Sequence, residues 1–267
     1  MIRKLLTLFP CILIVCTIYA QTGNDLIIVA SADNDLVKVL STNGARFKRY
    51  QSVKGALDAA PENAGMMVLA DHYPDVRTVV DSAMFSAAAK KRLRLYIEYP
   101  AMIPGIKAEK TGYYKELPGN VPPERKYIST RGNEYVETGH YGAIVERVVV
   151  NSDAFGTDLP KMSILELKDC HYVPFKTPAS HLVLTRVEGY NKAIYGITEK
   201  FSPLLFEHPD KRILVATTKL SQFVTGRYAP TDAWKAVINM IMKWTTGSDY
   251  LHLLKWKPVV APSYSKT

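Results

Sequence analysis

Cysteine is scarce in this chain, and its distribution excludes a disulfide framework. Two of the three cysteines, Cys11 and Cys16, lie in the first twenty residues, so a chain without that segment keeps only Cys170. A single cysteine forms no intramolecular disulfide, and an oxidising compartment permits such bonds without requiring them. The only neighbour of Cys170 that could activate it is His171, so a small buried side chain is favoured over a reactive thiol.

Several motifs that carry chemistry are also missing. No Gly-x-Gly-x-x-Gly and no Walker-type phosphate loop occurs, so a nucleotide cofactor is not expected. The six histidines lack the spacing of His-x-x-x-His with a carboxylate, and we expect no metal. No Ser or Cys occupies a Gly-x-Ser-x-Gly turn. We therefore expect no cofactor, and we favour a non-enzyme while leaving a glycoside hydrolase open.

No uncharged apolar run is long enough for a stable membrane span. The run Leu5–Ala20 has 16 residues, contains Pro10 and follows two cations, whereas a transmembrane helix needs about 20 apolar residues. This pattern is typical of a secretory signal. We expect residues 1–20 to be a cleavable signal peptide and the remaining protein to be exported, in the periplasm, associated with the outer membrane or extracellular. A lipoprotein and a retained N-terminal anchor are the less favoured alternatives.

The charge is strongly basic but dispersed. The formal net charge is +9, or +7 without Arg3 and Lys4. The densest cationic cluster, Lys90–Arg94, resembles the exposed end of a helix, where cations suit the helix dipole. The chain has no basic arm and no nucleic-acid motif, so we expect no nucleic-acid partner. An acidic glycan is the more plausible anionic partner.

Strand and helix patterns alternate in the first part of the chain. Continuous apolar runs at Leu26–Ala30, Met66–Ala70 and Leu93–Tyr99 are typical of strands that are covered on both faces. Helical spacing lies between them, including a predicted helix over Thr78–Arg92. Because this order implies right-handed crossovers, we expect an α/β fold with a mainly parallel, doubly wound, flavodoxin-like sheet.

The second part departs from this alternation. Proline and glycine over residues 100–142 predict an irregular insert, and the closely spaced strand signals that follow predict antiparallel additions to the sheet. A last helix over Asp232–Thr245 carries an apolar stripe and ends at Gly247. We therefore expect an α/β domain over 21–247 and a linker or tail over 248–267.

Candidate ligand-binding residues follow from one rule for parallel sheets. Ligands of open α/β sheets lie outside the carboxyl ends of the strands. The loop after the strand ending at Thr217 precedes a helix and offers cations and aromatic faces to an anionic or hydroxyl-rich ligand. Together with the turns after the third and fourth strands it supplies the predicted site residues, namely Asp71, His72, Glu98, Tyr99, Lys219, Gln222, Arg227 and Tyr228.

Catalysis at this edge has two candidate residues. Asp71 and Glu98 follow neighbouring strands, and a retaining glycosidase needs two carboxylates about 5 Å apart. The alternative is that Glu98 is a structural carboxylate bound by backbone N–H groups and that Asp71 caps a turn. For the loop after Thr217 the alternative is packing, against a neighbouring domain or between the sheet and the last helix.

In element order, residues 24 to 247 resemble the class I glutamine amidotransferase-like fold in a non-catalytic form. The catalytic cysteine of that family would follow Ala70, where this chain has Asp71-His72. In addition, Leu214–Pro230 with Asp232–Trp234 is similar to amino-terminal regions of large exported polysaccharide-degrading proteins of gut Bacteroidetes, in which a glycosidase domain follows. The resemblance implies an accessory or carbohydrate-binding module of an exported glycan-utilisation system, or the truncated N-terminal region of a glycosidase. Its expected partner is a glycan or a neighbouring glycosidase domain. A glycan hydrolase and a structural domain-docking protein are the alternatives.

Overall fold

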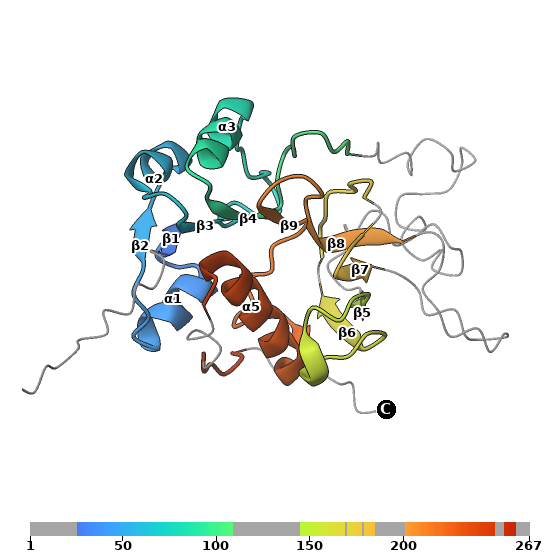
Figure 1. Ribbon diagram of the computed structural model, residues 1–267. Helices are drawn as coiled ribbons and strands as arrows, with labels where there is room; N and C mark the ends of the chain where they lie inside the picture. The colour runs from blue at the N-terminus through green and yellow to red at the C-terminus, as the bar shows by residue number, and fades with distance from the viewer. Residues whose placement is uncertain are drawn as a thin grey trace, which may run out of the picture.

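The computed structural model describes residues 26–108, 145–168, 170–177, 179–184, 201–248 and 254–259 (Figure 1). The predicted signal peptide, the predicted insert from residue 109 onwards and the tail beyond residue 259 lie outside the described residues. Within the part that is described, no helix is long and apolar enough to cross a membrane.

Ten strands form one mixed sheet with the order β10-β6-β5-β7-β8-β9-β4-β3-β1-β2. Four α-helices and one short 3-10 helix accompany it in the described residues. In chain order the elements are β1 (Leu26–Val29), α1 (Asp35–Thr42), β2 (Lys48–Tyr50), α2 (Val53–Ala59), β3 (Gly65–Val68), α3 (Ser82–Lys90), β4 (Arg94–Glu98), β5 (Val145–Val150), η1 (Gly156–Asp158), β6 (Ile164–Lys168), β7 (Leu182–Leu184), β8 (Ser202–Glu207), β9 (Ile213–Ala216), β10 (Tyr228–Ala229) and α5 (Thr231–Thr246).

The sheet divides into a half with parallel strands and a half with antiparallel strands. β2, β1, β3, β4 and β9 are all parallel, in the strand order of flavodoxin-like sheets. From β9 onwards every pairing is antiparallel, through β8, β7, β5 and β6 to β10. The expected fold class, a doubly wound α/β sheet with added antiparallel strands, is confirmed, and the antiparallel extension is as wide as the parallel half.

Helices cover both faces of the parallel half (Figure 1). α1 and α5 pack on one face and share a hydrophobic cluster with Ile28, Met67 and Tyr96, while α2 and α3 pack on the other with Ile27 and Met66. Neighbouring strand residues therefore alternate between two buried layers, and each strand is apolar throughout. Gly65 lies directly beneath the backbone of α5, because a Cβ there would meet the carbonyl oxygen of Thr245.

Side-chain caps decide where the early helices begin. Asn34, Ser52 and Asp81 each accept a hydrogen bond from a backbone N–H in the first turn of α1, α2 and α3. The predicted helix over Thr78–Arg92 begins too early, because Thr78 instead forms a bridge with Pro100 and Asp81 is the N-cap. At Thr78 the backbone pairs with the segment after β4 and does not continue the helical pattern.

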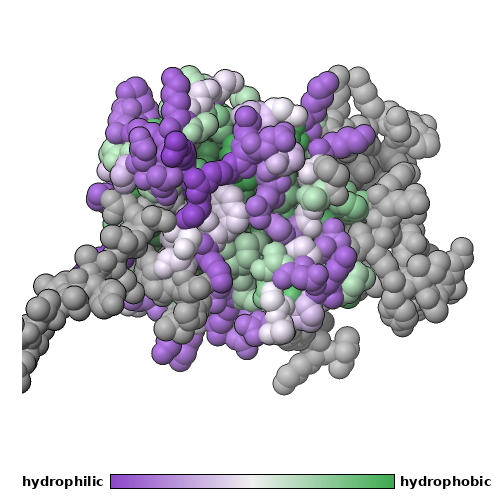
Figure 2. All heavy atoms as spheres, in the orientation of Figure 1, coloured by the Kyte–Doolittle hydropathy of each residue, from purple (hydrophilic) through white to green (hydrophobic). Residues whose placement is uncertain are grey.

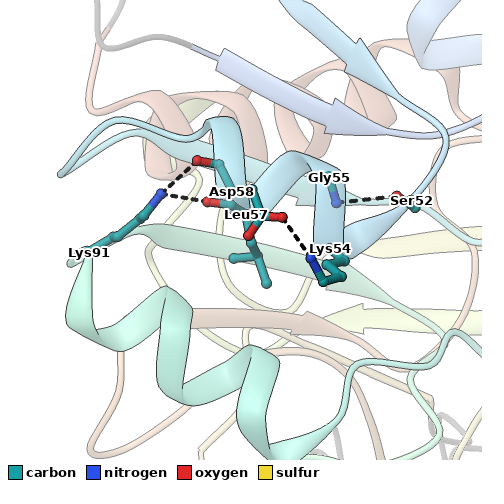
Figure 3. Close-up of polar contacts among 6 residues, drawn as sticks. All are labelled: Ser52, Lys54, Gly55, Leu57, Asp58 and Lys91. Carbon is teal, nitrogen blue, oxygen red and sulfur yellow. Dashed lines mark hydrogen bonds and ion pairs between the residues drawn. The ribbon is translucent and has the colours of Figure 1, made fainter.

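A lysine joins the two helices on one face of the sheet. The Lys91 ammonium group, just after α3, donates to the carbonyl oxygens of Leu57 (2.6 Å) and Asp58 (3.1 Å) at the carboxyl end of α2 (Figure 3). It also donates to the Ala60 carbonyl at 2.8 Å. These are carbonyls that have no partner within a helix. The cation also matches the negative end of the helix dipole.

The segment 254–259 is packed on the body of the protein. Trp256 lies against Phe223 with ring centroids 4.6 Å apart, and the Val259 N–H donates to the Val224 carbonyl at 2.8 Å. Asn43, after α1, exchanges hydrogen bonds with the Lys255 backbone. This part of the predicted linker therefore follows the surface between α1 and the loop after β9.

Candidate functional site

The carboxyl ends of the parallel strands meet at a topological switch point between β1 and β3. The chain leaves β1 towards β2 on one side, whereas β3 leads to β4 on the other. The Ser31 N–H, after β1, donates to Asp71 Oδ2, after β3, at 2.6 Å. This bond joins the two loops at the position where α/β sheets of this order bind ligands.

Glu98 lies at the centre of this edge and is only 1% exposed. Oε1 accepts hydrogen bonds from the Tyr96 hydroxyl (2.9 Å) and the Leu220 N–H (3.1 Å). Oε2 accepts from the Ser221 hydroxyl (2.7 Å) and the Ala70 N–H (3.2 Å). Burial raises the pKa of the Glu98 carboxyl group, and these donors and the nearby Lys219 oppose that rise.

A second buried carboxylate holds the same loop from the opposite side. Oδ2 of Asp35, in the first turn of α1, accepts from the Val224 N–H (2.9 Å), the Thr225 N–H (2.7 Å) and the Thr225 hydroxyl (2.9 Å). Its neighbour Asn34 donates to the Ser221 hydroxyl at 2.9 Å. The loop after β9 is therefore fixed to both the sheet and α1.

The predicted residues of this loop occupy different environments. Lys219, Gln222 and Arg227 are partly exposed, whereas Tyr228 is 3% exposed. The Tyr228 hydroxyl donates to the Lys219 carbonyl at 2.8 Å, and its ring packs edge-on against Trp234. Phe223 is 1% exposed beneath Trp256. The two aromatic faces expected to stack on a ligand are thus used in packing.

Asp71 and His72 are exposed in the turn after β3. Partial burial raises the pKa of the Asp71 carboxyl group, while the Ser31 N–H and the positive charges of Lys219 and Arg49 act against this rise. Asp71 and Lys219 are therefore brought together from different loops. This group presents a carboxylate, an imidazole and cations to solvent at one place.

A polar cluster that the sequence did not predict adjoins Tyr99. Tyr99, 7% exposed, packs edge-on against Tyr73 with ring centroids 5.1 Å apart. The Tyr73 hydroxyl accepts from the His171 N–H at 2.6 Å and lies 3.2 Å from Thr218 Oγ1. The Cys170 thiol, 1% exposed, donates to the same threonine oxygen at 3.6 Å. Tyr73 follows β3 as Asp71 does, which is the signal that would have indicated its place at this edge.

The arrangement at this edge is suited to binding. Glu98, Asp35, Cys170 and Tyr228 are buried and make hydrogen bonds within the protein, while the exposed groups are donors and acceptors from separate loops. Among the described residues no group of three His, Cys, Asp or Glu side chains is arranged to hold a metal ion.

Comparison with known proteins gives a likeness at the level of three-dimensional structure. No family model matches the chain, and no curated protein matches its sequence. Among solved structures the chain is similar to a ThuA-like protein from Bacteroides uniformis, with a TM-score of 0.44 and 10% sequence identity over 85% of this chain and 93% of that one.

Proposed function

We propose that the carboxyl ends of β1 and β3 bind a carbohydrate and that the protein is a binding component of an exported glycan-utilisation system. The observation that carries the proposal is the Ser31–Asp71 hydrogen bond across the switch point, with His72 and Lys219 beside it. The Cys170 thiol at this edge is buried and is therefore not presented to a ligand.

The chemistry of the exposed groups matches a sugar. Hydroxyl groups both donate and accept, so a carboxylate such as Asp71 accepts from them while Lys219 and Arg49 donate to them. Hydrogen bonds to charged groups are stronger than those between neutral groups. The buried Glu98 and Asp35 keep the loop of Lys219 in one conformation, which lowers the entropic cost of binding.

A hydrolase that uses Asp71 and Glu98 is less well supported. A general acid or nucleophile must touch the sugar, and Glu98 is 1% exposed with four hydrogen-bond donors around its two oxygens. In this proposal Glu98 is a positioning residue for the loop.

A docking role has one observation in its favour. The exposed apolar side chains Val76 (55%), Val79 (66%) and Met102 (40%) lie on the segments that join at the Thr78–Pro100 bridge, next to the carboxyl edge. On the opposite side, Trp256 is packed on Phe223. A neighbouring domain would therefore contact the edge near Val79 rather than the last helix.

The test is glycan binding by the chain without residues 1–20, first on a glycan array and then by calorimetry. Each charge-assisted bond contributes about 1.5–3 kcal/mol, so we expect Asp71→Ala and Lys219→Ala to weaken binding about tenfold or more. Lys54→Ala, on the exposed surface of α2, is the matched control and should leave binding unchanged. Equal affinity in all variants, or a chain that binds no glycan but binds a protein through Val79, would reject the carbohydrate site.

A further inference from the structure

A serine, a histidine and a glutamate lie in line on the antiparallel half of the sheet. Ser152 Oγ is 2.9 Å from His181 Nδ1, and His181 Nε2 is 3.2 Å from Glu207 Oε1. Ser152 is partly exposed, and the exposed fractions of the side chains of His181 and Glu207 are 18% and 49%. His181 is therefore within hydrogen-bond reach of both Ser152 and Glu207, and all three side chains are at least partly open to solvent.

The hydrogen bonds assign a proton to each position. The Glu207 carboxylate only accepts, so the bond to it requires a proton on His181 Nε2. In a neutral imidazole Nδ1 is then unprotonated, and it accepts the hydroxyl proton of Ser152. A nucleophile, a base and a group that orients the base are thus present in the order that acyl transfer uses.

Strand pairing brings these residues together at the edge opposite Asp71. Ser152 follows β5, His181 precedes β7, and Glu207 ends β8. β8 runs antiparallel to β9, so its carboxyl end lies at the amino ends of the parallel strands. The Asn151 N–H donates to the His181 carbonyl at 2.8 Å, which fixes the serine turn next to the histidine.

A cleft of about 720 Å³ opens beside Glu207 and Ala154. It is lined by Glu207, which binds His181, and by Ala154, whose N–H donates to Ser152 Oγ at 3.3 Å. Most of its charged lining is cationic, with Arg94, Lys211, Arg212 and Lys243.

We propose that Ser152, His181 and Glu207 form a hydrolytic site for carboxylic esters, separate from the proposed carbohydrate site near Asp71. Ser152 Oγ attacks the ester carbonyl carbon while its proton passes to His181 Nδ1. The C–O bond to the alcohol then breaks, and the leaving alkoxide takes that proton, which leaves an acyl-serine. Water attacks the acyl-serine, gives its proton to His181, and releases the carboxylic acid as the proton returns to Ser152.

A purely structural role for Ser152 would require only the hydrogen bond within its own turn. Its oxygen accepts from the N–H two residues on, as Ser31 does from the Asp33 N–H at 3.1 Å. Such a turn needs no histidine and no carboxylate. The His181–Glu207 pair beside Ser152 is what distinguishes the two serines.

The experiment uses a fluorophosphonate probe with mass-spectrometric site mapping, together with hydrolysis of 4-nitrophenyl acetate by the chain without residues 1–20. We expect the probe to label Ser152 and Ser152→Ala to lower kcat/KM about 100-fold or more. His181→Gln should lower both labelling and turnover. Ser86→Ala is the matched control, because this exposed helical serine donates only to the Ser82 carbonyl.

Each outcome bears on the proposal. Labelling at Ser152 that is lost in folded His181→Gln, as judged by circular dichroism, supports it. Labelling elsewhere, hydrolysis that survives Ser152→Ala, or no labelling and no hydrolysis by the unaltered protein overturns it. Glycan binding is also measured on Ser152→Ala. Failure of the carbohydrate site would appear as lost glycan binding, whereas failure of the ester site would appear as absent labelling and hydrolysis, so the two are distinguishable.

Discussion

The two edges of the sheet use their carboxylates at different depths. At the carboxyl edge of the parallel strands, Glu98 is 1% exposed and Asp35 is 6% exposed, and both accept hydrogen bonds from the loop after β9. At the opposite edge, the side chain of Glu207 is 49% exposed and contacts one histidine. The buried carboxylates fix the loop at the first edge, while the carboxylate at the second edge is open to solvent. Figure 2 shows one face of the molecule, on which polar side chains lie between apolar patches.

Depth decides what a carboxylate does in this fold. A buried carboxylate with four donors stabilises the backbone around it, and its removal leaves those donors without partners. A half-exposed carboxylate adds little stability because solvent screens it, yet it can orient a histidine that faces solvent. Substitutions at the two edges should therefore separate stability from activity.

The largest effect is expected for Glu98→Ala. The change leaves the N–H groups of Ala70 and Leu220 and two hydroxyl groups unpaired in the interior, so the free energy of unfolding should fall by about 3–5 kcal/mol. Urea denaturation at neutral pH measures it. Glu62→Ala, at an exposed glutamate, is the control. A loss below about 1 kcal/mol would show that depth does not govern the role of Glu98.

A pH series with Glu98→Gln should sharpen the comparison. Burial raises the pKa of Glu98 in the folded state above its ordinary value of 4.5. Between pH 4.5 and the folded-state pKa, the folded chain therefore binds a proton that the unfolded chain has lost. The contribution of Glu98 to stability is then greatest below pH 4.5 and declines as the pH rises through the folded pKa. The unfolding free energy of Glu98→Gln relative to the unaltered protein should therefore increase across this window, and a decrease would contradict the assignment.

The smallest change in stability is expected for Glu207→Gln. Because the glutamate side chain is 49% exposed, the unfolding free energy should change by less than about 1 kcal/mol. If the carboxylate orients His181, kcat for 4-nitrophenyl acetate should fall about tenfold or more while KM stays constant. Unchanged kcat would leave Glu207 as a surface partner of His181 and remove the contrast between the edges.

The parallel half was predictable because each of its strands is a local apolar run. Leu26–Val29 is buried at every position, so the run itself marks a strand covered on both faces. The carboxyl-edge rule also selected Asp71 and Glu98, which the structure brings to neighbouring loops. Their difference in depth was not predictable, since it depends on how the loop after β9 folds over Glu98.

The second site could not be found from spacing. Ser152, His181 and Glu207 are separated by 29 and 26 positions, and none lies in a recognisable motif. They meet because β5 pairs with β7, and β7 pairs with β8 across an irregular register. That register is a property of tertiary packing, and neither apolar periodicity nor residue spacing encodes it.

Lys91 has a consequence for how the protein opens. α2 spans seven residues, which is too short to be stable alone, and its last carbonyls are tied to an ammonium group carried by the end of α3. The two helices therefore form one cooperative unit on their face of the sheet. In native-state hydrogen exchange, the amides of α2 and α3 should therefore exchange together. The end of α2 should not fray until the hydrogen bonds of Lys91 break.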